Sequence, residues 1–120
     1  MQHIGVDIVE IARIEKAVGR WGQGFLTRVY TGKELELYGD QAPSLAARFS
    51  GKEAVIKALN GPGIALKDIE ILADASGKPS IKLYRQAQHQ ADAMGLVNLT
   101  ISLSHCKDYA IACAIGETRN

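Results

Sequence analysis

A long helix in the middle of the chain constrains the fold more than any other feature. Pro43 and Ser44 begin it, and the run Asn60-Gly61-Pro62-Gly63 ends it after about Leu59. A helix turns by about 100° per residue, so its large apolar residues gather on one arc, which consists of Leu45, Phe49, Ile56 and Leu59. This arc should face a core, and we expect the helix to bury that one flank.

A neighbouring stripe of the same helix is small or polar and carries an acid and a base. It consists of Ala46, Ser50, Glu53 and Lys57. In one interpretation, Glu53 and Lys57 are an ordinary surface ion pair at i,i+4, worth roughly 0.3–0.5 kcal/mol. In the other, both face a ligand in a shallow groove beside the helix. The helix taken alone favours the ion pair.

Alternating and apolar segments predict strands on both sides of this helix. Residues 2–9 alternate, and Asp7 shares a face with His3 and Gly5 near the end of that strand. Further strands are expected at 69–72, 80–83, 99–104 and 109–115, and further helices at about 10–20, within 25–42, and at about 84–94. The chain therefore predicts an α+β fold in which a largely antiparallel sheet packs with a long helix and shorter helices. We expect one domain over residues 1–120.

The charge balance and hydropathy exclude several classes of function. Lys and Arg number 14 against 13 Asp and Glu, giving a formal net charge of +1, so no basic field predicts a nucleic-acid partner. The apolar runs are too short for a membrane span, and the first residues indicate a strand rather than a signal peptide. We expect a soluble cytoplasmic protein in which Cys106 and Cys113 stay reduced.

Two acidic residues at special positions suggest a magnesium site. Asp7 lies near the C-terminal end of the first strand, and Glu53 lies on the polar stripe of the long helix. Mg²⁺ is often held by one or two carboxylates together with substrate phosphates, whereas the absence of clustered Cys and His disfavours zinc. Lys57 would then face the same phosphates. An exposed Asp at a strand end is common, however, and sequence alone does not show that Asp7 and Glu53 meet.

Two further features have a structural interpretation beside a functional one. Gly61-Pro62-Gly63 is most simply a helix stop, although its backbone is open to a ligand because few side chains block the approach. It is not a P-loop, since the pattern GxxxxGK[ST] is absent from the chain. His105 is most simply a turn histidine with a satisfied hydrogen bond.

Four motifs taken together favour the functional interpretations. IGVDIVEIARIE, RFSGKEAVIKAL, GKP at 77–79 and SLSHCKDYAIA occur in this order. With these motifs the chain resembles the holo-acyl-carrier-protein synthases, the small bacterial type of 4'-phosphopantetheinyl transferase, from about Gly5 to Ala112. The pairing of an Asp-containing first strand with the helix motif F-x-x-K-E-A-x-x-K-A is specific to that superfamily.

The resemblance implies a 4'-phosphopantetheinyl transferase-like fold and a reaction. The 4'-phosphopantetheine arm of coenzyme A would move to a serine of apo acyl carrier protein, releasing 3',5'-ADP, in support of fatty acid biosynthesis. Mg²⁺ would be the cofactor, bound by Asp7 and Glu53. Glu53 would take the serine proton directly or through a metal-bound water.

The resemblance also implies contacts to coenzyme A. Lys57 would face the phosphate under attack, and Arg48 and His105 would lie near the 3'-phosphate. The loop against the nucleotide would consist of Gly61, Pro62 and Gly63. Cys106 departs from the Thr or charged residue that members of the family often carry near this position.

A basic stripe on the first helix has two interpretations as well. Arg13, Lys16 and Arg20 project roughly opposite the apolar side of that helix, which by itself indicates a solvated face. In the family that the chain resembles, the stripe would dock the acidic acyl carrier protein. The resemblance further implies a homotrimer with active sites between neighbouring subunits.

Two other functions stay open beside the transferase. One is a module that binds coenzyme A or the carrier protein without turnover. The other is a different Mg²⁺-dependent phosphoryl-transfer enzyme that uses a nucleotide, which the missing P-loop disfavours.

Overall fold

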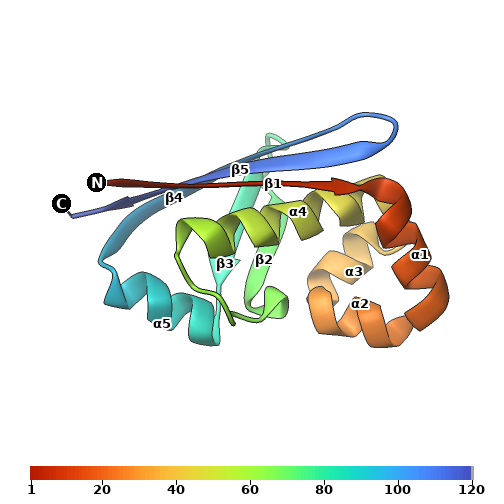
Figure 1. The fold of residues 1–120 in the computed structure, drawn as a ribbon, viewed down its shortest axis with the longest axis horizontal. Helices are drawn as coiled ribbons and strands as arrows, with labels where there is room; N and C mark the ends of the chain where they lie inside the picture. The colour runs from red at the N-terminus through yellow and green to blue at the C-terminus, as the bar shows by residue number, and fades with distance from the viewer. Residues whose placement is uncertain (120) are drawn as a thin grey trace.

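Two antiparallel sheets packed with α-helices make up the computed structural model, which describes residues 1–119 (Figure 1). In chain order the elements are β1 (Gln2–Glu10), α1 (Ile11–Trp21), α2 (Gln23–Val29), α3 (Gly32–Tyr38), α4 (Ala42–Ala58), a 3₁₀ turn η1 (Leu66–Asp68), β2 (Ile69–Ala73), β3 (Pro79–Leu83), α5 (Arg85–Ala93), β4 (Leu96–His105) and β5 (Tyr109–Thr118). The predicted α+β class with antiparallel pairing is confirmed. β4 begins at Leu96, earlier than the alternation from Leu99 predicts, and its register with β5 shifts between Leu96 and Asn98.

The larger sheet has the order β1-β5-β4 and lies along α4 (Figure 1). Small residues make this packing close. Ala112 and Ala114 of the central strand β5 are buried in one cluster with Ala54 and Ala58 of α4. On β1, a Cβ atom placed on Gly5 would lie only 1.8 Å from the carbonyl oxygen of Ala54. Glycine at position 5 therefore sets the distance between β1 and α4.

The opposite face of the β1-β5-β4 sheet is apolar and exposed. Successive side chains of a strand point to opposite faces, and those that point away from α4 include Ile4, Val6, Ile8, Ile111 and Ile115. Ile4 lies opposite Ile115 and Ile8 opposite Ile111 in the β1–β5 register. We call these five residues the open sheet face. A contiguous apolar patch of this kind marks an interaction surface.

The expectation that α4 buries a single apolar flank is wrong. Leu45 and Leu59 are buried as predicted, but Phe49 and Ile56 are only half-buried, whereas Ala46 and Ser50 of the neighbouring stripe are fully buried. The reason is the position of α4, which contacts the β1-β5-β4 sheet on one side and β2, η1 and α3 on another. A helix enclosed from several sides has no single apolar stripe.

Helices α1, α2 and α3 form a second buried cluster against the N-terminal half of α4. Its centre is Tyr30, which is fully buried and donates a hydrogen bond from its hydroxyl to the carbonyl of Leu45 at 2.6 Å. Burial raises the pKa of Tyr30, so the hydroxyl keeps its proton and acts as a donor. Within residues 1–119, no helix has the length and apolar character that crossing a membrane would require.

Candidate active site

Asp7 lies on β1 against α4, where two helix side chains contact its carboxylate. Ser50 donates a hydrogen bond to Asp7 Oδ2 at 3.1 Å. Lys57 places its Nζ 3.3 Å from Asp7 Oδ1 and 2.8 Å from the carbonyl oxygen of Val6. The Asp7 side chain is 19% exposed and that of Lys57 is 54% exposed, so the contact is open to solvent on the lysine side. Lys57 therefore pairs with Asp7 of β1, and the ion pair with Glu53 that the helix spacing suggests is not among the contacts of residues 1–119.

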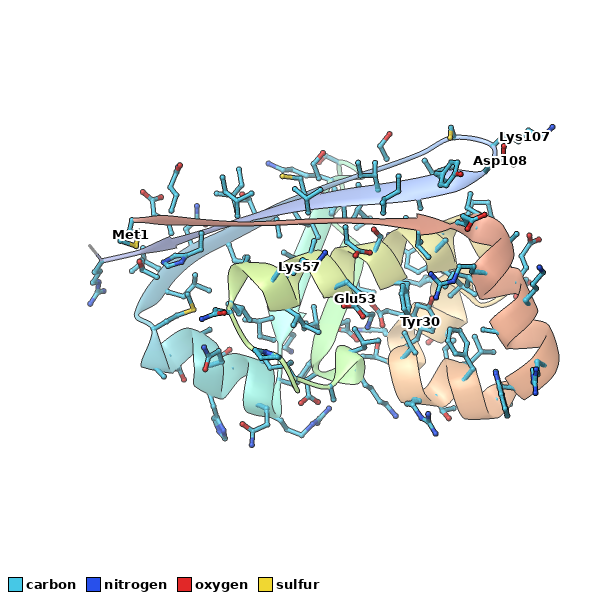
Figure 2. The ribbon with its side chains drawn as sticks, viewed as in Figure 1. Met1, Tyr30, Glu53, Lys57, Lys107 and Asp108 are labelled. Atoms are coloured by element: carbon cyan, nitrogen blue, oxygen red, sulfur yellow. The ribbon has the colours of Figure 1, made fainter. Side chains whose placement is uncertain are left out.

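Glu53 lies between Ser50 and Lys57 along α4, about one turn from each, on the side of the helix that faces β1 (Figure 2). Its carboxyl is half-buried. Burial raises the pKa of Glu53, the negative charge of Asp7 raises it further, and the Lys57 ammonium opposes both effects. Asp7 and Glu53 thus influence each other electrostatically across the β1–α4 contact. The structure brings together the two carboxylates that the sequence singles out.

This arrangement fits a hard divalent cation with few protein ligands. Because the Asp7 charge disfavours ionisation of Glu53, a positive charge shared by the two carboxylates would favour the charged form of Glu53. In the described part of the chain, no group of three or more His, Cys, Asp or Glu residues could hold a metal ion. A cation here would keep waters or take oxygens from a substrate, as Mg²⁺ does and as structural zinc does not.

The loop after α4 adjoins a shallow open pocket. His3, Lys57, Asn60, Gln90 and Met94 are among the residues that line this pocket of about 380 Å³. In the loop itself, Gly61 is buried, and a Cβ there would lie 2.3 Å from the side chain of Ile64. Gly63 has a φ of +99°, a conformation that favours glycine. Pro62 and Gly63 are exposed, so their backbone is accessible to a ligand.

Arg48 and His105 occupy contrasting environments. Arg48 is buried on α4, stacks its guanidinium 3.7 Å from the centre of the Tyr38 ring, and donates from Nε to the carbonyl of Ile71 at 3.1 Å. His105 is the exposed last residue of β4, beside the hairpin that leads to β5. No hydrogen bond joins the two residues within the described chain. Their predicted place at a common phosphate stays a prediction.

A buried ion pair that the sequence patterns do not predict lies beside the site. Lys52, the residue before Glu53, is fully buried and forms a 2.7 Å ion pair with the equally buried Glu34 of α3. Burial lowers the pKa of Lys52, and the Glu34 charge opposes that effect. One sequence signal was available, because Thr31 and Glu34 have the spacing of a capping box. The structure contains that box at the start of α3.

The predicted basic stripe is exposed. Arg13, Lys16 and Arg20 all face solvent on α1, while Ile11 and Ile14 are buried. The Arg20 guanidinium lies 4.8 Å from the centre of the exposed Trp21 ring, which continues the stripe with an aromatic surface. Both cysteines are free thiols, Cys106 exposed in the β4–β5 hairpin and Cys113 half-buried on β5.

The sequence of this chain is similar to those of known proteins along almost its whole length. A family model described as the 4'-phosphopantetheinyl transferase superfamily matches residues 3–114. A protein named holo-[acyl-carrier-protein] synthase from Dehalococcoides mccartyi strain CBDB1 is 49% identical over 118 residues, which cover 98% of this chain and 99% of the relative. A protein of the same name from Herpetosiphon aurantiacus is 45% identical over 121 residues, with 93% and 95% covered.

Solved structures agree with these relatives. The crystal structure of Helicobacter pylori holo-[acyl-carrier-protein] synthase in complex with coenzyme A superposes with a TM-score of 0.86 at 36% identity, covering 95% of this chain and 99% of the other. The holo-ACP synthase from Plasmodium yoelii gives a TM-score of 0.87 at 31% identity, with 98% and 95% covered.

Proposed function

Because the chain belongs to the 4'-phosphopantetheinyl transferase superfamily, we propose that it transfers 4'-phosphopantetheine from coenzyme A to a serine of apo acyl carrier protein. The products are holo acyl carrier protein and 3',5'-ADP. The observation that carries the proposal is the meeting of Asp7, Glu53 and Lys57 where β1 packs on α4. The name shared by full-length relatives and the coenzyme A complex of the Helicobacter pylori protein support the same substrates.

The chemistry is an in-line displacement at phosphorus. The serine Oγ forms a bond to the β-phosphorus of coenzyme A, while the bond from that phosphorus to the bridging oxygen breaks and 3',5'-ADP leaves with the electron pair. Such a transfer requires positioning and charge stabilisation more than covalent help from the protein. Lys57 is suited to stabilise the negative charge on the phosphate oxygens because its ammonium is exposed next to Asp7.

Glu53 is the proposed acceptor of the serine proton. Burial and the Asp7 charge raise the pKa of Glu53, and a carboxylate with a raised pKa holds a proton more readily. Ser50, through its hydrogen bond to Asp7 Oδ2, keeps the neighbouring carboxylate oriented. In this proposal the proton acceptor lies on α4, and the contact between β1 and α4 orients the neighbouring carboxylate.

We further propose that the reaction depends on Mg²⁺ held by Asp7 and Glu53. When bound, the ion supplies charge neutralisation to the pyrophosphate. The support is the chemistry of the donor set, which consists of two neighbouring carboxylates without a third acidic, His or Cys ligand among residues 1–119.

The substrate-binding residues are proposed in the same terms. Coenzyme A would contact Lys57, the Gly61, Pro62 and Gly63 loop, Arg48 and His105. The carrier protein would dock on Arg13, Lys16 and Arg20, whose exposure on one side of α1 supports that role. We place the reaction in fatty acid biosynthesis and in the cytoplasm.

We also propose a homotrimer with active sites between subunits, and the open sheet face supports it. Its large apolar side chains are 38–61% exposed in the single chain, an arrangement that a second copy would cover. Sedimentation equilibrium should give three times the chain mass, and Ile111→Glu should reduce it to the monomer. Leu37→Glu places the same charge on another exposed apolar residue, on α3, and should leave the assembly intact. A monomeric wild-type protein would refute the proposed trimer.

The transfer itself is tested by mass. The protein is incubated with apo acyl carrier protein, coenzyme A and Mg²⁺, and the carrier is weighed by intact mass spectrometry. We expect the carrier to gain the mass of one phosphopantetheine arm. Chelation of Mg²⁺ should abolish this gain, and the Glu53→Ala variant should not produce it. Binding of coenzyme A without any gain, across several carrier proteins, would instead favour a binding module.

A further inference from the structure

The buried Lys52–Glu34 pair joins four elements, and Lys52 uses all of its hydrogen-bond donors to do so. Lys52 Nζ donates to Glu34 Oε1 at 2.7 Å, to the carbonyl of Leu66 at 3.1 Å and to the carbonyl of Ile69. An ammonium has three protons, so these acceptors satisfy it completely. Lys52 therefore connects α4 to α3, to η1 and to the start of β2.

Glu34 is equally constrained by the protein around it. Its Oε1 also accepts a hydrogen bond from the backbone N–H of Thr31 at 2.9 Å, and its Oε2 accepts one from the N–H of Ile71 at 2.8 Å. Both side chains of the pair have no exposed surface. The carboxylate that receives Lys52 is thus fixed by α3 and β2 before α4 contributes anything.

Lys52 directly precedes the proposed metal ligand Glu53 in sequence, but its side chain lies on another side of α4. Successive helix residues are separated by about 100° around the axis. Lys52 points toward η1 and β2, whereas Glu53 points toward β1 and Asp7. Arg48, one turn before Lys52, is fixed on the same side through its hydrogen bond to Ile71. A rotation of α4 that turned Glu53 away from Asp7 would have to break these contacts.

Contacts on the β1 side fix the helix in a different way. There the backbone of α4 lies against Gly5, within reach of Ala54 and Ala58. A contact between backbones limits how closely β1 and α4 approach. Ser50 and Lys57 add side-chain hydrogen bonds from α4 to Asp7 and Val6 of β1, but those of Lys57 are exposed to solvent. Rotation of α4 is therefore opposed on both sides, and the fully buried side chains that oppose it, Lys52 and Glu34, lie on the side away from β1.

Stability alone is a weak reason for such a pair. Removing two charges from water costs free energy that their attraction often only offsets, and well-packed apolar residues would hold α4 at least as firmly. The best-attested benefit of a buried polar pair is that it selects one arrangement over its alternatives. In this protein the arrangement selected is the rotation of α4.

We propose that the buried Lys52–Glu34 pair is a positioning device for the proposed active site, holding α4 in the rotation that directs Glu53 to Asp7. The proposal rests on the proposed function, because it concerns the same carboxylates. It predicts that removing the pair weakens binding of a divalent cation while the protein stays folded.

The test is the double variant K52M/E34Q, which removes both charges together and so leaves no unpaired buried ion. Binding of Mn²⁺ in the presence of coenzyme A is followed by electron paramagnetic resonance, and the fold by circular dichroism and thermal melting. We expect a cooperatively folded protein with an Mn²⁺ dissociation constant about tenfold higher, at the low end of the loss that follows removal of an orienting contact at a metal site. Glu34→Asp, which keeps both charges and shortens the side chain that receives Lys52, provides a milder second variant in case the double variant does not fold.

The matched control is the double variant R85M/D68N, which removes a different ion pair, one that includes Asp68 of η1. Arg85 Nε lies 2.7 Å from Asp68 Oδ1, the same separation as in the Lys52–Glu34 pair, but the two side chains join η1 to the start of α5 and make no hydrogen bond to α4 within residues 1–119. Since Arg85 is largely exposed, we expect Mn²⁺ binding within about twofold of the wild type.

The outcomes separate this proposal from the function on which it rests. If the wild-type protein does not bind Mn²⁺ with coenzyme A, the proposed metal-dependent function fails. If the wild type binds and K52M/E34Q, folded, binds equally well, the positioning role is refuted. An equal loss in the R85M/D68N control would also refute it, because the effect would then belong to η1 and not to Lys52.

Discussion

Replacing Gly5 by alanine is the most direct perturbation of the proposed active site. The new Cβ would lie 1.8 Å from the Ala54 carbonyl oxygen and 2.8 Å from the backbone N of Ala58, whereas Cβ atoms keep at least 3.0 Å from such neighbours. The obstacle is backbone on both sides, so β1 and α4 must separate by about 1.2 Å. Asp7, two residues further on β1, moves with the strand and away from Glu53.

This displacement has consequences for activity and for stability. A misplacement of about 1 Å can reduce a transfer rate by about 100-fold, and overpacking of a core contact costs about 1–3 kcal/mol. We expect a loss of that order in the rate of carrier modification, measured by intact mass, and a lower midpoint of urea unfolding. Gly32→Ala makes the same chemical change where no atom lies within 4 Å and should alter both by little. A Gly5→Ala protein with wild-type rate and stability would refute the assigned role of the β1–α4 contact.

Three further predictions concern docking, protonation and capping. Arg13→Glu should raise the KM for the carrier protein roughly fivefold, and less at high salt, while the KM for coenzyme A stays unchanged. Lys82→Glu on β3 makes an equal charge change on another exposed residue and should leave the KM for the carrier protein unchanged. Equal effects of the two variants would refute the docking role. The pKa of Glu53 is raised above its ordinary 4.5, so the folded protein loses stability as pH rises through that pKa. Glu53→Gln should therefore increase the melting temperature at neutral pH and abolish transfer, and the gain in melting temperature should vanish below pH 4.5. No gain at neutral pH would contradict the cost of burying the Glu53 charge beside Asp7. Thr31→Ala removes the α3 cap and a 2.6 Å hydrogen bond to Glu70. It should lower the free energy of unfolding, measured with urea, by about 1–2 kcal/mol. The control Thr27→Ala, at an exposed position, should lower it by less than about 0.5 kcal/mol.

The elements with a clear period could be predicted from the sequence. β1 alternates over its whole length, and the Asn60-Gly61-Pro62-Gly63 run ends α4 close to the expected residue. Both hairpins lie where turn residues separate two apolar runs. Local patterns carry this information because backbone geometry repeats within each element. The meeting of Asp7 with the α4 stripe was only a hypothesis, since it depends on a contact between residues more than forty positions apart.

The surroundings of α4 could not be predicted in this way. Its periodicity suggested one buried flank, yet Ala46, Ser50 and Lys52 are buried on other sides. Lys and Glu are almost never fully buried unless they are paired, so a sequence-based reading places Lys52 and Glu34 on the surface. Their pairing depends on how α3, η1 and β2 surround the helix, which no local pattern encodes.

The two carboxylates of the proposed site are positioned by residues just before them in the chain, and by opposite means. Two residues before Asp7, Gly5 allows β1 to touch the α4 backbone because it has no side chain. One residue before Glu53, Lys52 uses a long charged side chain to reach Glu34 and to oppose rotation of α4. Each motif thus contains a proposed metal ligand and the residue that we propose positions it. It follows that Gly5→Ala and K52M/E34Q disturb one separation, that of Asp7 from Glu53, from two sides of the same helix. Their effects on divalent-cation binding should therefore be non-additive, and strictly additive losses would show that the two contacts act on different features of the site.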